Sequence, residues 1–176
     1  MNFKHGGDVK GFAAEVGCNL SEVVDLSSNI NFIKPDNSID FNTIDISSYP
    51  TYSELYKNIA NLYGIQDTEL ELFNGASSAI FSLFRFFDTR YCYIYSPAYL
   101  EYKKAAVTFD YQVELVNRFV DLDIEVIENS LVVFVNPSTP DGSFYDIDAL
   151  LSKWMQKNCT ILIDESFIEF TMQKSC

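Results

Sequence analysis

The sequence has few residues of the types that make metal sites and disulfide frameworks. It contains one histidine and four cysteines in 176 residues, and no two cysteines form a C-x-x-C pair. A zinc site or a disulfide framework needs closely spaced ligands or paired cysteines, so both are disfavoured. We therefore expect reduced thiols, no metal and a cytoplasmic protein. The cysteines are Cys18, Cys92, Cys159 and Cys176.

Long apolar runs and basic charge are also scarce. The opening "MNFKHGGDVK" has no apolar segment of a secretory signal, and the longest apolar runs, such as "LVVFV", are far too short to span a bilayer. Twelve basic against 25 acidic residues give a formal net charge of −13. Such a surface repels phosphate backbones and anionic lipids, so we expect neither nucleic acid nor membrane as a partner.

Several catalytic signatures are missing as well. No nucleophile elbow, Walker loop or zinc signature occurs, and "NGASS" lacks the spacing of a dinucleotide fingerprint. Hydrophobic residues nevertheless make up 48% of the chain and aromatic residues 15%, which is enough for one globular core.

Apolar runs alternate with amphipathic segments through most of the chain. The runs contain no regular polar positions, which is typical of strands that are buried on both faces. The pattern predicts an α/β fold with a mostly parallel sheet and helices on both faces. Expected strands are 22–29, 70–73, 91–95, 112–116, 131–135 and 160–163; expected helices are 11–17, 51–64 (with a Thr51–Glu54 capping box), 77–87, 98–107 (begun by Pro97) and 146–157 (capped by Asp146).

Ligands of open α/β sheets bind beyond the carboxyl ends of the strands, so the residues there are candidates. After 70–73 comes "NGASS", where Gly75 permits close backbone approach and the helix start with Ser77 could cradle a phosphate. A serine N-cap after a turn glycine explains the same letters and, taken alone, is favoured.

Three further candidates follow the later strands. Tyr99 could cover a flat ligand, although an ordinary packing aromatic is the more common case. Asn136 could donate to a ligand oxygen or simply form an Asn-Pro turn. Asp164 ends a buried strand, where its charge needs a cation or hydrogen-bond donors, unless it caps the next segment. His5, in "HGGD", could reach a ligand from an arm or belong to a terminal tail.

Together these motifs resemble one family. The order "HGGD", "SSNIN", "YP", "NGAS", "PAY", "NPSTPDG", "DESF" is similar to the N-terminal half of the fold-type I, pyridoxal-phosphate (PLP)-dependent aminotransferases, in the branch of threonine-phosphate decarboxylase and histidinol-phosphate aminotransferase. The resemblance covers essentially the whole chain. It implies residues 1–50 as an arm for substrate and dimer contacts, and residues 51–176 as an incomplete PLP-binding large domain.

The resemblance also implies a role for each candidate. Asp164 would pair with the pyridine nitrogen of PLP, Asn136 with its phenolic oxygen, and Tyr99 would stack on the ring. Three residues would hold the phosphate: Gly75, Ala76 and Ser77. Tyr49 would reach the cofactor of the other subunit of a homodimer, and His5 and Asn31 would face the substrate.

Some positions depart from the family pattern. Phe167 replaces a tyrosine of many aminotransferases and suits the decarboxylase branch, and Phe32 stands where proline is usual. No certain catalytic residue is found: the Schiff-base lysine segment and the C-terminal domain have no counterpart, and Lys174 is too close to Asp164 to be that lysine.

The hypotheses are therefore a threonine-phosphate decarboxylase-like enzyme part acting on a phosphorylated amino acid or amine, or a histidinol-phosphate aminotransferase-like one. A catalytically inactive remnant and a nucleotide- or phosphate-binding module remain as alternatives.

Overall fold

The computed structural model describes residues 6–28, 33 and 40–175, with no side-chain description for residue 41. The chain divides into two compact units, Met1–Thr51 and Tyr52–Cys176. In the first unit, α1 (Val9–Val16) is capped by Asp8, whose Oδ1 accepts from the Gly11 N–H at 2.9 Å, and ends at Gly17 with φ of 73°. Short 3-10 turns follow at η1 (Leu20–Glu22) and η2 (Phe41–Thr43).

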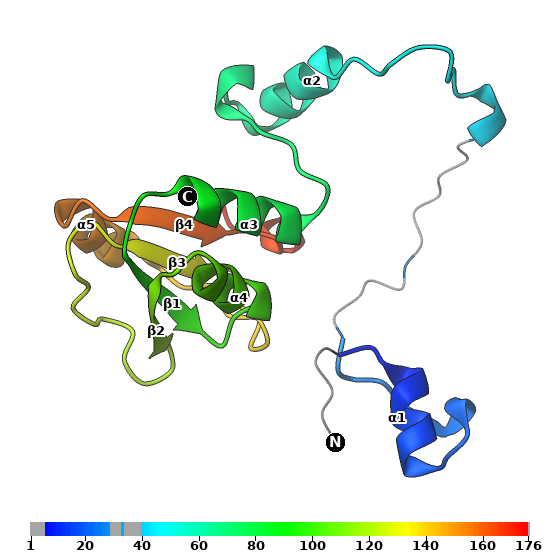
Figure 1. Ribbon diagram of the computed structural model, residues 1–176, viewed down its shortest axis with the longest axis horizontal. Coiled ribbons are helices and arrows are strands. Elements are labelled where there is room, and N and C mark those ends of the chain that lie inside the picture. The colour runs from blue at the N-terminus through cyan, green and yellow to red at the C-terminus, as the bar shows by residue number, and fades with distance from the viewer. Residues whose placement is uncertain (1–5, 29–32, 34–39, 176) are drawn as a thin grey trace. The chain divides into compact units, whose positions relative to one another are not determined.

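The second unit is built on a four-stranded sheet in which every pairing is parallel (Figure 1). The order is β2-β1-β3-β4, so the two earliest strands occupy one side and the two later ones the other. The strands are β1 (Tyr91–Ser96), β2 (Gln112–Asn117), β3 (Leu131–Val135) and β4 (Thr160–Asp164). The predicted α/β fold with a parallel sheet is confirmed.

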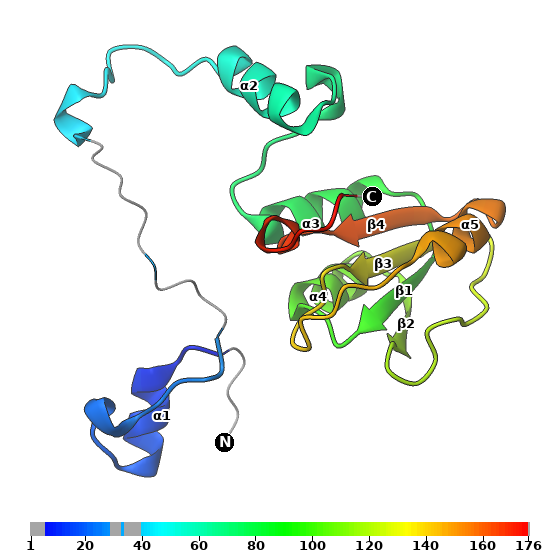
Figure 2. The same ribbon diagram turned by 180° about the vertical axis from the view of Figure 1, so that it is seen from behind.

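Helices cover both faces of this sheet, as expected (Figures 1 and 2). Successive strand residues point to opposite faces, so Leu131 and Val133 pack with α3 and α4, while Val132 and Phe134 pack with α5. Each helix buries residues four apart, such as Ile80 and Phe84 on α3. The helices are α3 (Ala76–Phe86), α4 (Leu100–Thr108) and α5 (Asp148–Gln156).

Ahead of the sheet come α2 (Ser53–Tyr63) and the 3-10 turn η3 (Asp67–Glu69), and a last turn, η4 (Ile168–Phe170), follows β4. Helix α2 ends at Gly64, with φ of 67°, as the sequence predicts. The predicted capping box is wrong, because the N-cap is Tyr52 and no side chain caps the helix. Thr51 lies one residue too early to accept from the first turn.

Two predicted strands do not form. Residues 70–73 are irregular, because the four strands of the sheet pair only among themselves and leave this segment without a neighbour. In 22–29, Glu22 ends the 3-10 turn η1, and residues 23–28 are irregular. There Asp25 accepts hydrogen bonds from the N–H and hydroxyl of Ser27, a local turn that competes with an extended strand.

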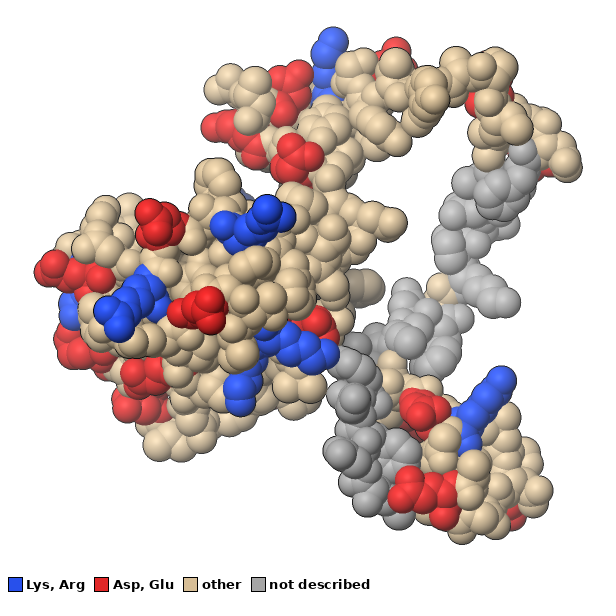
Figure 3. All heavy atoms as spheres, in the orientation of Figure 1, with Lys and Arg blue, Asp and Glu red and all other residues tan. Residues whose placement is uncertain are grey.

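Two helix starts differ from their predictions. Helix α4 begins at Leu100 rather than Pro97, with Tyr99 at the N-cap. Helix α5 has Ile147 at its N-cap, although the Asp146 carboxylate still accepts from the Asp148 N–H at 3.3 Å. On the face seen in Figure 3, acidic and basic side chains are interspersed over the second unit. No helix in the described ranges is long and apolar enough to cross a bilayer.

Candidate functional site

The carboxyl ends of β3 and β4 lie side by side. In the register of the two strands Val135 pairs with Asp164, and the N–H of Asn136 donates to the Asp164 carbonyl at 2.9 Å. Two of the candidate residues, 28 positions apart in the sequence, are therefore neighbours. Parallel pairing requires this, because all carboxyl ends then meet at one edge.

The Asp164 carboxylate is held by three donors. Tyr102 donates from its hydroxyl to Oδ2 at 2.5 Å, and Ser166 donates to Oδ1 from its N–H at 2.9 Å and from its hydroxyl at 2.5 Å. An ionised carboxylate accepts about four hydrogen bonds, so it has room for one more donor. Asp164 therefore does cap the turn at Ser166, as one interpretation of the sequence predicts. The same carboxylate still has one position that can accept a hydrogen bond from a ligand.

Tyr102 is a buried side chain, 3% exposed. Burial and then the Asp164 charge raise the pKa of the Tyr102 hydroxyl well above its ordinary value. It therefore stays a protonated donor to the carboxylate at any physiological pH. Sequence analysis missed this residue, although a tyrosine three positions after Tyr99 on a predicted helix lies on the same helix face.

The turn at the start of α3 presents backbone N–H groups that a ligand can approach. Gly75, at the N-cap, has φ of 87° and ψ of 157°, a conformation essentially confined to glycine. Ala76 and Ser77 are the first two residues of α3, so their N–H groups have no carbonyl partner within the helix and can donate to an anion. The Ser77 hydroxyl lies 3.3 Å from the Tyr99 hydroxyl, which joins this turn to the start of α4. Tyr99 is 45% exposed, so part of the residue is open to solvent.

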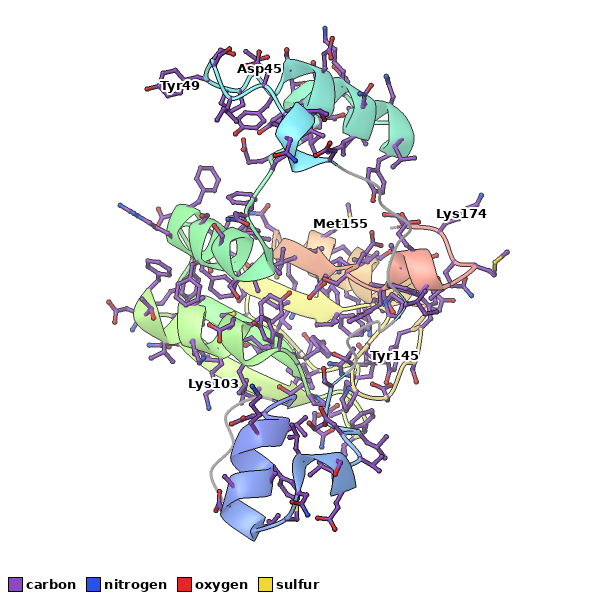
Figure 4. The ribbon with its side chains drawn as sticks, turned by 90° about the vertical axis from the view of Figure 1, so that its right-hand side faces the viewer. Asp45, Tyr49, Lys103, Tyr145, Met155 and Lys174 are labelled. Atoms are coloured by element: carbon purple, nitrogen blue, oxygen red, sulfur yellow. The ribbon has the colours of Figure 1, made fainter. Side chains whose placement is uncertain are left out.

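Asn136 is 1% exposed and is tied to the backbone of Tyr145 in both directions. Its Nδ2 donates to the Tyr145 carbonyl at 3.0 Å, and its Oδ1 accepts from the Tyr145 N–H at 2.9 Å. The two bonds fold the segment between the two residues back onto the end of β3, where Figure 4 labels Tyr145. One Nδ2 hydrogen remains for a ligand. The turn-forming interpretation of Asn136 and the ligand-donor one are therefore compatible.

Helix α4 connects these parts. Tyr99 reaches Ser77 at the start of α3, and Tyr102, one turn later, reaches Asp164 at the end of β4. Asp164 is in turn bonded through its backbone to Asn136. Hydrogen bonds thus link candidates from four different segments of the second unit into one site.

The remaining candidates lie in the first unit, outside the described residues or elsewhere in the second unit. Tyr49 is 96% exposed in the first unit, with its side chain pointing away from its own segment in Figure 4. His5, Asn31 and Phe32 lie outside the described residues. Lys174 is exposed and points away from the sheet in Figure 4. Within the described ranges, no group of three or more histidine, cysteine, aspartate or glutamate residues could hold a metal ion.

The chemistry of this donor set suits PLP. Backbone N–H groups at the start of α3 fit a phosphate, and the tyrosine at the α4 N-cap offers an aromatic face to a flat ring. The open acceptor position on Asp164 fits a protonated ring nitrogen, and the spare amide hydrogen of Asn136 fits an oxygen on the ring.

The parallel sheet and its helices match part of the fold of PLP-dependent transferases, as a solved structure that aligns with the chain shows. That structure is the L-threonine-O-3-phosphate decarboxylase of Porphyromonas gingivalis, with a TM-score of 0.62 and 20% identity over 70% of this chain and 38% of that chain. This likeness concerns the fold.

The family follows from the sequence comparison. The chain belongs to the family "Aminotransferase class I and II", whose model matches residues 23–175. The adenosylcobalamin biosynthesis bifunctional protein CobDQ of Leptospira interrogans is 30% identical over 98% of this chain and 22% of its own length. The histidinol-phosphate aminotransferase of Clostridium beijerinckii is 33% identical over 72% of this chain and 38% of its own. The chain spans about half or less of the length of these and other curated relatives. Enzymes of this family use PLP.

Proposed function

We propose that this chain forms the cofactor-holding part of a PLP-dependent enzyme that acts on a phosphorylated amino acid or amine. The single observation that carries the proposal is the pair of bonds from α4, Ser77–Tyr99 and Tyr102–Asp164. They hold a phosphate-binding turn, an aromatic face and a carboxylate in one connected site, which is the set of groups that PLP requires.

Each residue has a defined task in this proposal. Gly75, Ala76 and Ser77 bind the phosphate, and Tyr99 covers the ring. Asp164 accepts a hydrogen bond from the protonated ring nitrogen and keeps its proton in place, while Tyr102 and Ser166 keep the carboxylate oriented. Asn136 donates to the phenolic oxygen. PLP, when bound, supplies an electron sink for the carbanion formed at the substrate α-carbon.

Within this family we favour threonine-phosphate decarboxylase-like chemistry. A relative named "Putative threonine-phosphate decarboxylase" and a threonine-phosphate decarboxylase align over 96% and 97% of this chain. Phe167 also lacks a hydroxyl that many aminotransferases place near the phenolic oxygen. The alternative is a histidinol-phosphate aminotransferase-like transaminase, which is favoured by the 33% identity to such an enzyme. We further propose a homodimer in which Tyr49 contacts the other subunit's cofactor, with His5 and Asn31 facing the substrate.

Binding of pyridoxamine 5′-phosphate to the full 176-residue chain tests the proposal. This amine form of the cofactor cannot form imines with surface lysines, so calorimetry reports the site itself. We expect saturable binding, weakened about 10–100-fold in Asp164→Asn, since a hydrogen bond to a charged partner contributes roughly 1.5–3 kcal/mol. Asp88→Asn, an exposed change outside the site, should bind as the unmodified chain does.

Two outcomes would contradict the proposal, and a third bears on the inactive alternative. No binding up to millimolar ligand would overturn cofactor binding by this chain. Tight binding of a nucleotide without pyridoxamine phosphate would favour the nucleotide- or phosphate-binding alternative. With PLP itself, a stoichiometric long-wavelength absorbance band that survives dialysis, disappears on borohydride treatment and is lost in Asp164→Asn would argue against the inactive alternative, because imines with surface lysines do not depend on Asp164.

A further inference from the structure

Arg118 is a buried cation at the carboxyl end of the sheet, and it has no role in the proposed function as described above. It follows β2 directly and is 3% exposed in a protein whose formal net charge is −13. Burying a guanidinium is costly unless its donors are matched. Burial lowers the pKa of Arg118, and the nearby Asp141 carboxylate opposes that shift.

The side chain of Arg118 crosses from the edge strand to the middle of the sheet. Its NH2 group donates to the carbonyls of Tyr95, at 3.0 Å, and of Pro97. Its NH1 group donates to the Val135 carbonyl at 3.3 Å. β2 and β3 lie on opposite sides of β1, so one guanidinium spans the ends of three neighbouring strands.

The three carbonyl acceptors lie where two loops begin, and each of these loops carries a residue that is proposed to bind the cofactor. Pro97 lies two residues before Tyr99, and Val135 lies one residue before Asn136. The guanidinium carbon also lies 5.8 Å from the Phe134 ring centroid, which restricts its position. The planar fork can donate in several directions at once, whereas a lysine ammonium is a single point.

We propose that Arg118 is a positioning residue that fixes the loops of Tyr99 and Asn136 relative to each other and so sets the geometry of the cofactor site. This inference rests on the proposed function for its ligand. Its effect on the two loops can be measured without any ligand.

The test compares three variants of the full chain. Arg118→Met removes all donors at similar length, and Arg118→Lys keeps the charge but not the fork. Tyr111→Phe is the matched control, because the Tyr111 hydroxyl donates to the Phe84 and Phe87 carbonyls, at 2.7 and 2.9 Å, from the residue just before β2, at the opposite end of that strand. The readouts are urea unfolding, amide hydrogen exchange of residues 97–102 and 136–145, and affinity for pyridoxamine 5′-phosphate.

For Arg118→Met we expect exchange of both loops to accelerate about tenfold more than that of β1 and β3, and ligand affinity to fall about tenfold. In Arg118→Lys we expect slow amide exchange to be restored in only one of the two loops, because an ammonium cannot reach all three carbonyls. Tyr111→Phe should lower stability while the loops and the affinity stay unchanged. Uniform loss of protection in Arg118→Met, or loop protection that Lys restores fully, would overturn the inference. If the unmodified chain binds no cofactor, the proposed function fails, and the exchange result alone decides the role of Arg118.

Discussion

The Tyr102 hydroxyl donates a 2.5 Å hydrogen bond to Asp164 Oδ2 across 62 positions of sequence. This bond joins the first turn of α4 to the end of β4, and it gives the carboxylate a fixed direction. An acid at the end of a half-buried strand is costly when its charge is unpartnered. Here a buried donor stabilises it and leaves an acceptor position for a ligand.

Replacing Tyr102 by phenylalanine should therefore weaken cofactor binding. We expect the dissociation constant for pyridoxamine 5′-phosphate to rise by about tenfold, which is ~1.4 kcal/mol. Tyr93→Phe removes a buried hydroxyl that accepts from the Ile127 N–H on the other face of the sheet, and serves as the control. Equal affinity of the two variants in calorimetry would remove Tyr102 from the site.

A methyl group on Gly75 should separate backbone strain from ligand binding. An added Cβ at Gly75 or at Gly64 meets nothing within 4 Å, and both residues have positive φ. We expect Gly75→Ala and Gly64→Ala each to lower the free energy of unfolding by about 1–3 kcal/mol. Only Gly75→Ala should also reduce phosphate-dependent affinity, measured with pyridoxamine phosphate against pyridoxamine. A loss of phosphate-dependent affinity in both variants would argue against phosphate binding at the start of α3.

Asp141 should make stability depend on acid pH. Burial alone would raise the pKa of Asp141, but hydrogen bonds, first from Ser138, hold it at about 2, below its ordinary 3.8. Because the folded pKa is depressed, this contribution is fully present above about pH 4 and is lost as the pH falls toward 2. We expect no more than about 1 kcal/mol, since the side chain is exposed and screened.

Urea unfolding at pH 5, above both pKa values, and at about pH 2.5, between the folded and the ordinary pKa, measures the loss of this contribution. Asp141→Asn should show a flatter profile than the unmodified chain, whereas Asp88→Asn should keep the slope. Parallel profiles for the two variants would show that the Asp141 bonds do not persist in solution.

The core beneath α5 should depend on Trp154. This side chain is 1% exposed, and its ring centroid lies 5.5 Å from that of Tyr95 and 6.1 Å from that of Phe134. Trp154→Ala should cost about 3–5 kcal/mol of unfolding free energy, followed by circular dichroism in urea. Met155→Ala, next on the helix and 69% exposed, should cost less than about 0.5 kcal/mol. Figure 4 labels Met155 on this helix. Comparable losses in both variants would contradict the packing.

By itself the sequence determined the four strands that form the sheet and the residues at their carboxyl ends. The run 131–135 contains only apolar residues, which predicts a strand covered on both faces, and all five are buried. β1 follows the prediction in its four central residues, whereas β4 is half-buried and β2 is mostly exposed because they are the edge strands of the sheet. The sequence also predicted that α1 and α2 end at Gly17 and Gly64, because glycine readily adopts the positive φ that closes a helix.

Only the tertiary structure decided what depends on neighbours far along the chain. Residues 70–73 have strand-like letters but no partner strand, and a strand is stabilised only by its partner's hydrogen bonds. Tyr102 and Arg118 look like ordinary helix and loop residues until folding places them against Asp164 and against three strand-end carbonyls. Sequence spacing puts Tyr102 on the same helix face as Tyr99, but the contact partners of Tyr102 and Arg118 are set by the order in which the strands pair.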